Sequence, residues 1–254
     1  GKIIGGNGGK AGNNLNDSLP GLSSQGGTGV QMLGGTWLSN TSSGTIRGGL
    51  NGNAQGGAAA IEVFEDKNQI FNNANILSAD ESDNAIAIHI RGSDNYLTLF
   101  EKSFIKGKVI SDGVRNTFTL SGSDLGSFNA SQIGDEAQYQ GFESFLKAGE
   151  GTWELSGATK ALTPWTVQEG TLSIQSDANL GSSNGILTLD GGTLEFRSFY
   201  DDEDDDEWNE IIEIYRPIIL TANDGYIDTY SEDGIIYSEI QGEGGLQKSG
   251  EHHL

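Results

Sequence analysis

In residues 141–196 the chain repeats a pair of apolar residues separated by a single polar one. The pairs are Trp153 and Leu155, Trp165 and Val167, Leu172 and Ile174, Leu187 and Leu189, and Leu194 and Phe196. Alternation with a period of two predicts a short β-strand with one apolar face. Gly, Asn, Ser and Asp fill the gaps between pairs and predict turns. Because strands this short cannot be stable alone, the pattern predicts strands stacked turn upon turn in a solenoid.

The flanking segments continue this pattern less regularly. Residues 1–57 are rich in Gly and Asn around short apolar clusters, and they predict early rungs of the solenoid with broad loops. Residues 58–140 predict regular rungs, because Ile86, Ile88 and Ile90 alternate with Ala87, His89 and Arg91 in one of them. Residues 123–140 interrupt the rhythm and predict an excursion from the stack. A strand about every 10 residues also fits a sandwich or a barrel.

A second interruption is strongly acidic. Every residue from 201 to 207 is Asp or Glu, and mutual repulsion predicts a loop in solvent. Strand character resumes after it. We therefore predict a single elongated domain over residues 1–254, divided into early rungs (1–57), regular rungs (58–140), a repeat (141–196), an acidic loop excursion (197–210) and a continuation into the next repeat (211–254).

A short internal repeat supports this division. The segment Lys147-Ala148-Gly149-Glu150 returns as Lys248-Ser249-Gly250-Glu251, 101 residues further on. Extended at the same offset, the repeat places Leu254 over Trp153, at an inward position.

Composition narrows the class of protein. The 254 residues include 36 acidic and 14 basic side chains, a formal net charge of −22, and no Cys. This charge argues against a nucleic-acid partner and against an anionic membrane surface. Lack of Cys excludes disulfides and thiolate metal sites. The high Gly and charge content is also compatible with disorder, but disorder gives no reason for regularly spaced apolar residues.

Three stretches carry a resemblance to a known family. They read LKAGEGTWELSG at 146–157, WTVQEGTL at 165–172 and NLGSSNGILTLDGGTLEF at 179–196. Together they resemble the passenger-associated repeat of type Va autotransporters, the pertactin-like adhesins among them. The resemblance implies a right-handed parallel β-helix, located at the bacterial cell surface (outer membrane) or secreted. It also implies a C-terminal translocator β-barrel in the full-length protein.

No catalytic motif is recognisable in the sequence. A Ser-His-Asp triad needs a His, and His89 is expected on the outward face of a regular strand without its partners. Some β-helical enzymes act on polysaccharides with grouped carboxylates, and acids are frequent here. Acids between residues 80 and 136 include Asp80, Glu81, Asp83, Asp94, Asp112, Asp124, Asp135 and Glu136. The sequence does not show that any of them converge, so we assign no catalytic, cofactor-binding or metal-binding residue.

The acidic loop is the candidate binding segment. It offers Asp201, Asp202, Asp204, Asp205 and Trp208 as a possible partner-binding loop. The alternative interpretation is that its aromatic residues only fasten the loop base to the helix. A run of acids can also hold Ca²⁺, but this one lacks the alternating spacing of a calcium loop. Trp153 and Trp165 lie in the repeat register and are expected in the core.

We therefore expect a non-enzymatic adhesin. Its partners would be a host-cell surface protein, matrix or glycan, or neighbouring bacteria through self-association, with no nucleic acid and no cofactor. Two alternatives stay open: a released virulence effector that binds a specific host-cell receptor, and a β-helical carbohydrate-active enzyme.

Overall fold

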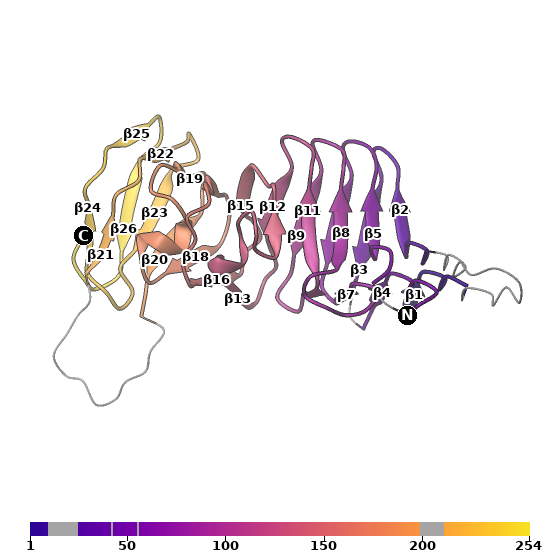
Figure 1. The fold of residues 1–254 in the computed structure, drawn as a ribbon. Coiled ribbons are helices and arrows are strands. Elements are labelled where there is room, and N and C mark those ends of the chain that lie inside the picture. The colour runs from indigo at the N-terminus through magenta and orange to yellow at the C-terminus, as the bar shows by residue number, and fades with distance from the viewer. Residues whose placement is uncertain (10–24, 42, 55, 199–210) are drawn as a thin grey trace, which may run out of the picture. The chain divides into compact units, whose positions relative to one another are not determined.

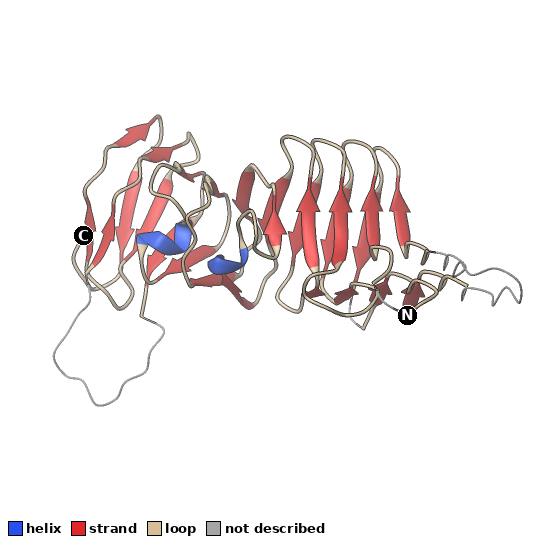
Figure 2. Cartoon of the chain, in the orientation of Figure 1, coloured by secondary structure: helices blue, strands red, loops and turns tan. Residues whose placement is uncertain are grey.

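The computed structural model describes residues 1–9, 25–41, 43–54, 56–198 and 211–254. Strands make up nearly all of the regular structure, and the two helices of the described residues are short 3₁₀ turns (Figure 2). The chain divides into two compact units, one of residues 1–117 and 135–142 and the other of residues 118–134 and 143–254. The predicted single domain remains a prediction.

The first unit is built from three parallel sheets that the chain visits in rotation (Figure 1). The first sheet holds β1 (Lys2–Ile4), β4 (Thr45–Arg47), β7 (Asn75–Leu77) and β10 (Phe104–Lys106). The second holds β2 (Val30–Met32), β5 (Ile61–Val63), β8 (Ile86–Ile90), β11 (Lys108–Ser111) and β14 (Tyr139–Gln140). The third includes β3 (Trp37–Asn40), β6 (Gln69–Asn72) and β9 (Tyr96–Leu99). Neighbouring strands of each sheet pair in parallel and come from successive turns of the chain, which defines a parallel β-helix.

The second unit repeats this arrangement. One of its sheets holds β15 (Ser144–Lys147), β17 (Trp165–Val167), β19 (Leu187–Leu189), β22 (Ile218–Leu220) and β25 (Ile240–Gly242), with β12 (Thr117–Leu120) beside β15. Another holds β13 (Leu125–Asn129), β16 (Thr152–Ser156), β18 (Thr171–Ile174), β20 (Thr193–Phe196), β23 (Gly225–Asp228) and β26 (Leu246–Ser249). The parallel pair of β21 (Ile212–Ile214) and β24 (Gly234–Ile236) adds a third side. The 3₁₀ turns η1 (Ala130–Gln132) and η2 (Asp177–Leu180) lie at corners.

The apolar pairs found in the sequence form the interior of the second unit. All ten residues of the five pairs are buried, Trp153 and Trp165 included. In-register pairing stacks Trp153 on Leu172 and Leu172 on Leu194. Burial of about 25 cal/mol per Å² of apolar surface makes such columns the main stabilising contribution in a narrow solenoid. The predicted all-β parallel β-helix is therefore confirmed, while its right-handedness stays a prediction.

Buried asparagines organise one corner of the first unit. Asn68, Asn95 and Asn116 are buried, and each follows a residue with positive φ. The side-chain oxygen of Asn95 accepts the backbone N–H of Asn68, and that of Asn116 accepts the backbone N–H of Asn95, both at 2.8 Å. This ladder satisfies backbone donors that the turn leaves without a strand partner.

The predicted placement of Leu254 over Trp153 is wrong. The column that contains Trp153 runs through Leu194 and Ile227 to Lys248. The two repeat copies do share a local motif, because each Lys ammonium donates to the carbonyl of a positive-φ Gly two residues later. This motif closes a corner of the coil, and it occurs after β15 in one sheet and at β26 in another. Its recurrence 101 residues later therefore does not predict which residues stack on one another.

The predicted excursion at residues 123–140 is also wrong in part. Residues Leu125–Asn129 form β13, which pairs in register with five residues of β16. Gly126 makes this pairing possible next to a large ring, because a Cβ there would lie 2.7 Å from Trp153. Outside residues 10–24, 42, 55 and 199–210, the structure holds no helix long and apolar enough to span a bilayer.

Candidate functional site

The predicted partner-binding residues Asp201, Asp202, Asp204, Asp205 and Trp208 lie outside the described residues. In the sequence they fall between β20, which ends at Phe196, and β21, which begins at Ile212. The candidate surface that the structure describes lies on β21 and its neighbour β24.

Two tyrosines are stacked on the outside of the second unit. Strands β21 and β24 pair in register, with Ile214 opposite Ile236, and Tyr215 and Tyr237 are the residues that follow these two. Their ring centroids are 5.1 Å apart with an interplanar angle of 9°. Since Ile214 is fully buried, alternation directs the next side chain outward. Tyr215 is 54% exposed and Tyr237 is 58% exposed.

One carboxylate binds both tyrosine hydroxyls. Glu213 accepts hydrogen bonds from Tyr215 at 2.6 Å and from Tyr237 at 3.0 Å. These bonds, that from Tyr215 first, hold the pKa of Glu213 below its ordinary value. The bond to Glu213 is also the main reason that the pKa of Tyr215 is raised to about 12, and it raises the pKa of Tyr237 as well. Charge-assisted bonds of this kind fix both rings before any partner arrives.

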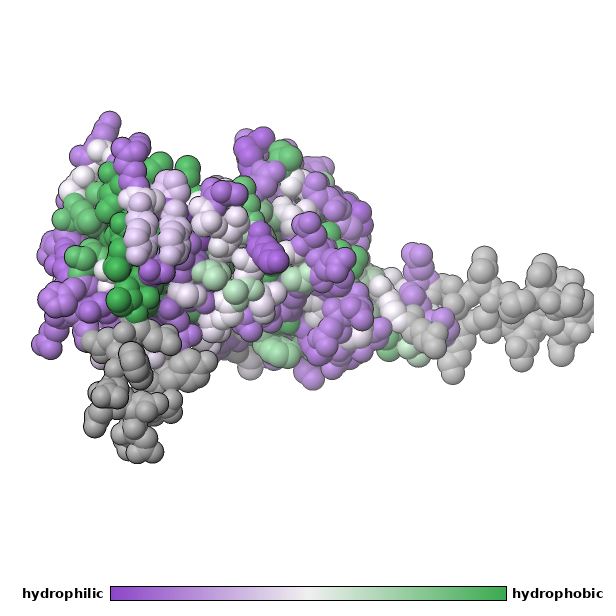
Figure 3. All heavy atoms as spheres, turned by 60° about the vertical axis from the view of Figure 1, so that its left-hand side comes forward, coloured by the Kyte–Doolittle hydropathy of each residue, from purple (hydrophilic) through white to green (hydrophobic). Residues whose placement is uncertain are grey.

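Exposed isoleucines extend the surface around the tyrosines. Ile235 of β24 lies opposite Glu213 of β21, and Ile211 directly precedes β21; both isoleucines are exposed. Figure 3 shows an apolar patch at this end of the second unit, where Figure 1 labels β21 and β24. We call the set of Ile211, Glu213, Tyr215, Ile235 and Tyr237 the tyrosine face.

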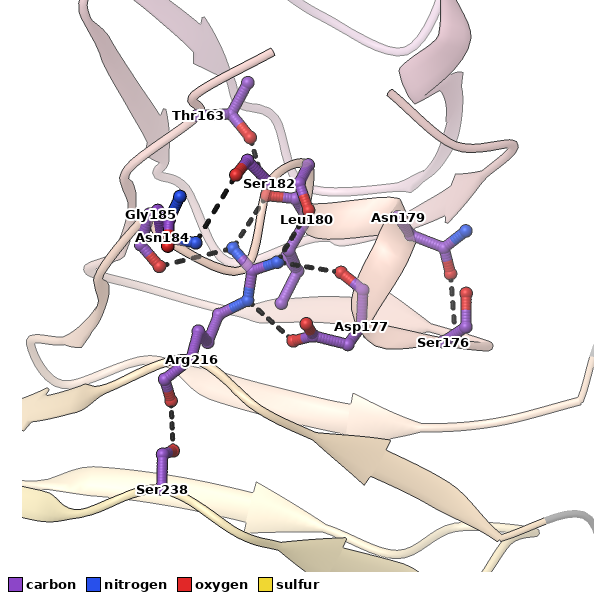
Figure 4. A network of polar contacts seen from close by, with 11 residues as sticks. Thr163, Ser176, Asp177, Asn179, Leu180, Ser182, Asn184, Gly185, Arg216 and Ser238 are labelled. Atoms are coloured by element: carbon purple, nitrogen blue, oxygen red, sulfur yellow. Dashed lines mark hydrogen bonds and ion pairs between the residues drawn. The ribbon is translucent and has the colours of Figure 1, made fainter. Parts of the chain in front are cut away.

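A buried arginine anchors the backbone beneath the tyrosine face (Figure 4). Arg216, the residue after Tyr215, is 0% exposed. Its Nε lies 2.6 Å from Asp177 Oδ1, and its terminal nitrogens donate to the carbonyls of Asp177, Leu180 and Gly181 at 2.8–2.9 Å. The guanidinium therefore caps the carbonyl end of η2 from inside the coil. Because residue 216 is held inward, its neighbour Tyr215 is held outward.

A hydroxyl also locks the two turns together. The Ser238 Oγ–H, directly after Tyr237, donates to the carbonyl of Arg216. This bond joins the residues that follow the two tyrosines, so it maintains the register in which their rings stack. The tyrosine face is thus positioned by the interior and not by contacts at the surface alone.

A row of polar side chains crosses the outward side of β16, β18, β20 and β23. In-register pairing aligns Glu154, Ser173, Glu195 and Asp228. Ser173 donates to Glu195 at 2.8 Å, and a guanidinium nitrogen of Arg197 lies 3.9 Å from the same carboxylate. Burial is the main cause of a raised pKa at Glu195, which the Ser173 and Arg197 contacts oppose.

His89 lies where the sequence predicts, on the outer side of β8. Its Nε2 is 2.6 Å from Asp112 Oδ2. In the part of the chain that the structure describes, no hydrogen bond joins a serine to this pair, so the geometry of a catalytic triad is not formed there. The described residues also contain no group of three or more His, Asp or Glu placed to hold a metal ion.

Sequence reasoning did not single out the tyrosine face. The signal was present, since Ile-Glu-Ile-Tyr at 212–215 and Gly-Ile-Ile-Tyr at 234–237 are 22 residues apart. Aligning the two segments would have placed both tyrosines on one outward column. Comparisons with protein-family models, with curated proteins and with solved structures find no match for this chain.

Proposed function

We propose that the chain belongs to a bacterial autotransporter passenger and acts as a non-catalytic adhesin through the tyrosine face. The export class and the location at the cell surface, or in the secreted fraction, rest on the resemblance of residues 146–196. A translocator barrel elsewhere in the full-length protein belongs to the same proposal. The partner is a protein or matrix surface on a host cell or on a neighbouring bacterium.

The observation that carries this proposal is the pair of exposed, pre-ordered tyrosines. An exposed tyrosine normally loses rotamer freedom when a partner binds, at a cost of roughly 0.5–1.5 kcal/mol. Stacking and the shared Glu213 carboxylate restrict Tyr215 and Tyr237 in advance. Tyrosine is among the residues that dominate protein interfaces, and flanking isoleucines can exclude water around it. When many copies of the chain are displayed on one cell, their individually weak contacts add up to firm attachment through avidity.

Beads coated with the purified chain test this proposal against immobilised matrix proteins and host-cell monolayers. The double variant Tyr215→Ala/Tyr237→Ala is expected to reduce bead attachment about tenfold, since a factor of ten corresponds to the loss of about 1.4 kcal/mol of binding free energy, which truncation of interface tyrosines commonly causes. Tyr230→Ala is the matched control, because Tyr230 is a similarly exposed tyrosine of the same unit that packs against Arg197. Equal attachment of the double variant and the wild type would contradict the proposal.

The row of polar side chains formed by Glu154, Ser173, Glu195 and Asp228 supports one other candidate function, the cleavage of a glycan. A protonated carboxyl next to an ionised one is the minimum that glycoside hydrolysis needs, and burial pushes Glu195 toward the protonated form by raising its pKa. Release of reducing sugar from a polysaccharide panel, abolished by Glu195→Gln, would favour this enzyme over the adhesin.

A further inference from the structure

The outward side of the third sheet in the first unit carries an exposed aromatic row. In-register pairing places Trp37 of β3 beside Gln69 of β6, and Gln69 beside Tyr96 of β9. Trp37 is 72% exposed and Tyr96 is 42% exposed. The next residues along the three strands, Leu38, Ile70 and Leu97, point toward the interior instead. Figure 1 labels β3 and β9 on this unit. We call Trp37, Gln69 and Tyr96 the aromatic row.

The polar atoms of this row are available to a ligand. Within the described ranges, the indole N–H of Trp37, the amide of Gln69 and the hydroxyl of Tyr96 form no hydrogen bond to the protein. The outward Ser39, two residues along β3, is exposed and likewise lacks a side-chain partner there. The tyrosine face differs, since both of its hydroxyls are bound by Glu213.

The aromatic row is also uncharged. The outward positions of β3, β6 and β9 hold aromatic rings, Ser, Gln and Thr only. At the adjoining corner, Asp94 pairs with Arg115 through two bonds at 2.7 and 2.8 Å, and Lys67 also helps to lower the pKa of Asp94, so this corner holds charges of both signs. The chain as a whole carries a net charge of −22 and repels anionic ligands. A neutral ligand that needs ring contacts and hydrogen bonds fits this surface best.

We infer that the aromatic row is a binding site for a neutral, extended oligosaccharide. A sugar ring presents C–H groups on its face and hydroxyls at its edge. The exposed indole of Trp37 packs against the face of the sugar ring, and the amide of Gln69 and the hydroxyl of Tyr96 form hydrogen bonds with the hydroxyls at its edge. Trp37 and Tyr96 are two strands apart, about 10 Å at the usual strand spacing, which is the length scale of a disaccharide. A glycan laid across the strands therefore meets two rings in succession.

This site is separate from the proposed adhesion surface. The aromatic row belongs to the first unit, whereas the tyrosine face belongs to the second. The glycan site neither requires the adhesin proposal nor follows from it. If both hold, one chain recognises a glycan and a second surface by different chemistry.

Calorimetric titration of the full chain with oligosaccharides tests the inference. The probes are cellohexaose and maltohexaose as neutral ligands, and a hyaluronan hexasaccharide as the anionic one. We expect the wild type to bind at least one neutral probe, with an affinity that does not change with salt, and to bind hyaluronan more weakly. Trp37→Ala should weaken binding about tenfold or more. Tyr96→Ala and Gln69→Ala should each weaken it measurably.

Matched controls distinguish binding at the aromatic row from binding elsewhere on the chain. Tyr215→Ala/Tyr237→Ala should leave the neutral affinity unchanged, and Tyr230→Ala should do the same. Trp37 is so exposed that its removal should not unfold the chain, which a far-ultraviolet circular dichroism spectrum verifies. Absence of binding to both neutral probes, tighter binding of hyaluronan, or equal affinity in Trp37→Ala would each overturn the inference. So would sedimentation that shows a dimer lost in Trp37→Ala, because a second copy would then cover the row.

Discussion

At the scale of single residues, Arg216 connects the interior of the second unit to its surface. It is fully buried, paired with Asp177 and bonded to three backbone carbonyls of the η2 corner. A buried ion pair adds little net stability relative to an apolar replacement of both partners, but removing one partner leaves a buried charge. The same residue fixes the outward direction of Tyr215.

Arg216→Met is therefore expected to lower the free energy of unfolding by about 3–5 kcal/mol, the usual cost of breaking a buried pair. Urea denaturation measures this change. Arg197→Met is the control, because Arg197 is partly exposed and its ion pairs are long, at 3.7 and 3.9 Å. It should cost less than about 1 kcal/mol. Similar values for the two variants would contradict the described role of Arg216.

The Tyr215–Glu213 bond predicts an unusual titration. The pKa of Tyr215 is raised to about 12, compared with about 10 for a free tyrosine. Because the pKa of Tyr215 is higher in the folded state than in the unfolded state, folding favours the neutral hydroxyl. The stability contributed by the neutral Tyr215 hydroxyl is fully present below about pH 10 and is lost as the pH rises through about 12.

Ultraviolet absorbance at alkaline pH measures this titration. The difference between the wild type and Tyr215→Phe should show one phenol that ionises near pH 12. Glu213→Gln should bring that phenol back toward its ordinary pKa, since the hydrogen-bonded carboxylate is the main cause of the shift. A difference spectrum centred near about pH 10, the ordinary tyrosine value, would show that the bond does not form in solution.

At the scale of elements, the corner asparagines show what local sequence does and does not reveal. Asn is recognisable as a turn former, and turns occur at these positions. The ladder cannot be read from the sequence, because it requires knowing that Asn68, Asn95 and Asn116 occupy the same corner of successive turns. The intervals of 27 and 21 residues differ, so no fixed period exposes the column.

Asn95→Ala is expected to cost about 1–3 kcal/mol, because it removes the acceptor of the Asn68 backbone N–H inside the coil. Thermal or urea unfolding gives the value. Thr188→Ala, on the outward side of β19, is a matched control that should change stability by less than about 0.5 kcal/mol. If Asn95→Ala unfolds like the control, water replaces the missing acceptor and the ladder is not a stabilising element.

Apolar alternation is the reliable predictor of elements in this chain. Each pair in residues 141–196 lies in a strand with both apolar residues buried, because a period of two leaves only one face for the core. The repeat based on Lys147 and Lys248 fails as a guide to register for a physical reason. A corner motif specifies backbone conformation, whereas column membership depends on every turn length between the two copies.

The candidate surfaces are harder to predict. The pairing of Tyr215 with Tyr237 is visible in the sequence only once their two segments are aligned at a spacing of 22 residues. Trp37 gives no such signal, and only the register of β3, β6 and β9 shows that Tyr96 lies two strands away from it. The residues proposed from composition, Asp201, Asp202, Asp204, Asp205 and Trp208, lie outside the described part of the chain. Their role stays a prediction.

At the scale of the whole molecule, two surfaces of different chemistry are proposed on one acidic chain. The tyrosine face is pre-ordered and has its hydroxyls bound, which suits a protein or matrix surface. The aromatic row has free hydrogen-bonding groups, which suits a neutral sugar. A net charge of −22 restricts both to partners that are not strongly anionic.

Adhesion by living cells tests the central claim most directly. The chain is displayed on a non-adherent bacterium, and attached cells are counted on host-cell monolayers and on matrix-coated surfaces. The account predicts that display confers attachment, that Tyr215→Ala/Tyr237→Ala reduces it about tenfold at equal display, and that Tyr230→Ala leaves it unchanged. Attachment that is absent with the wild type, or that survives the double substitution in full, would contradict it.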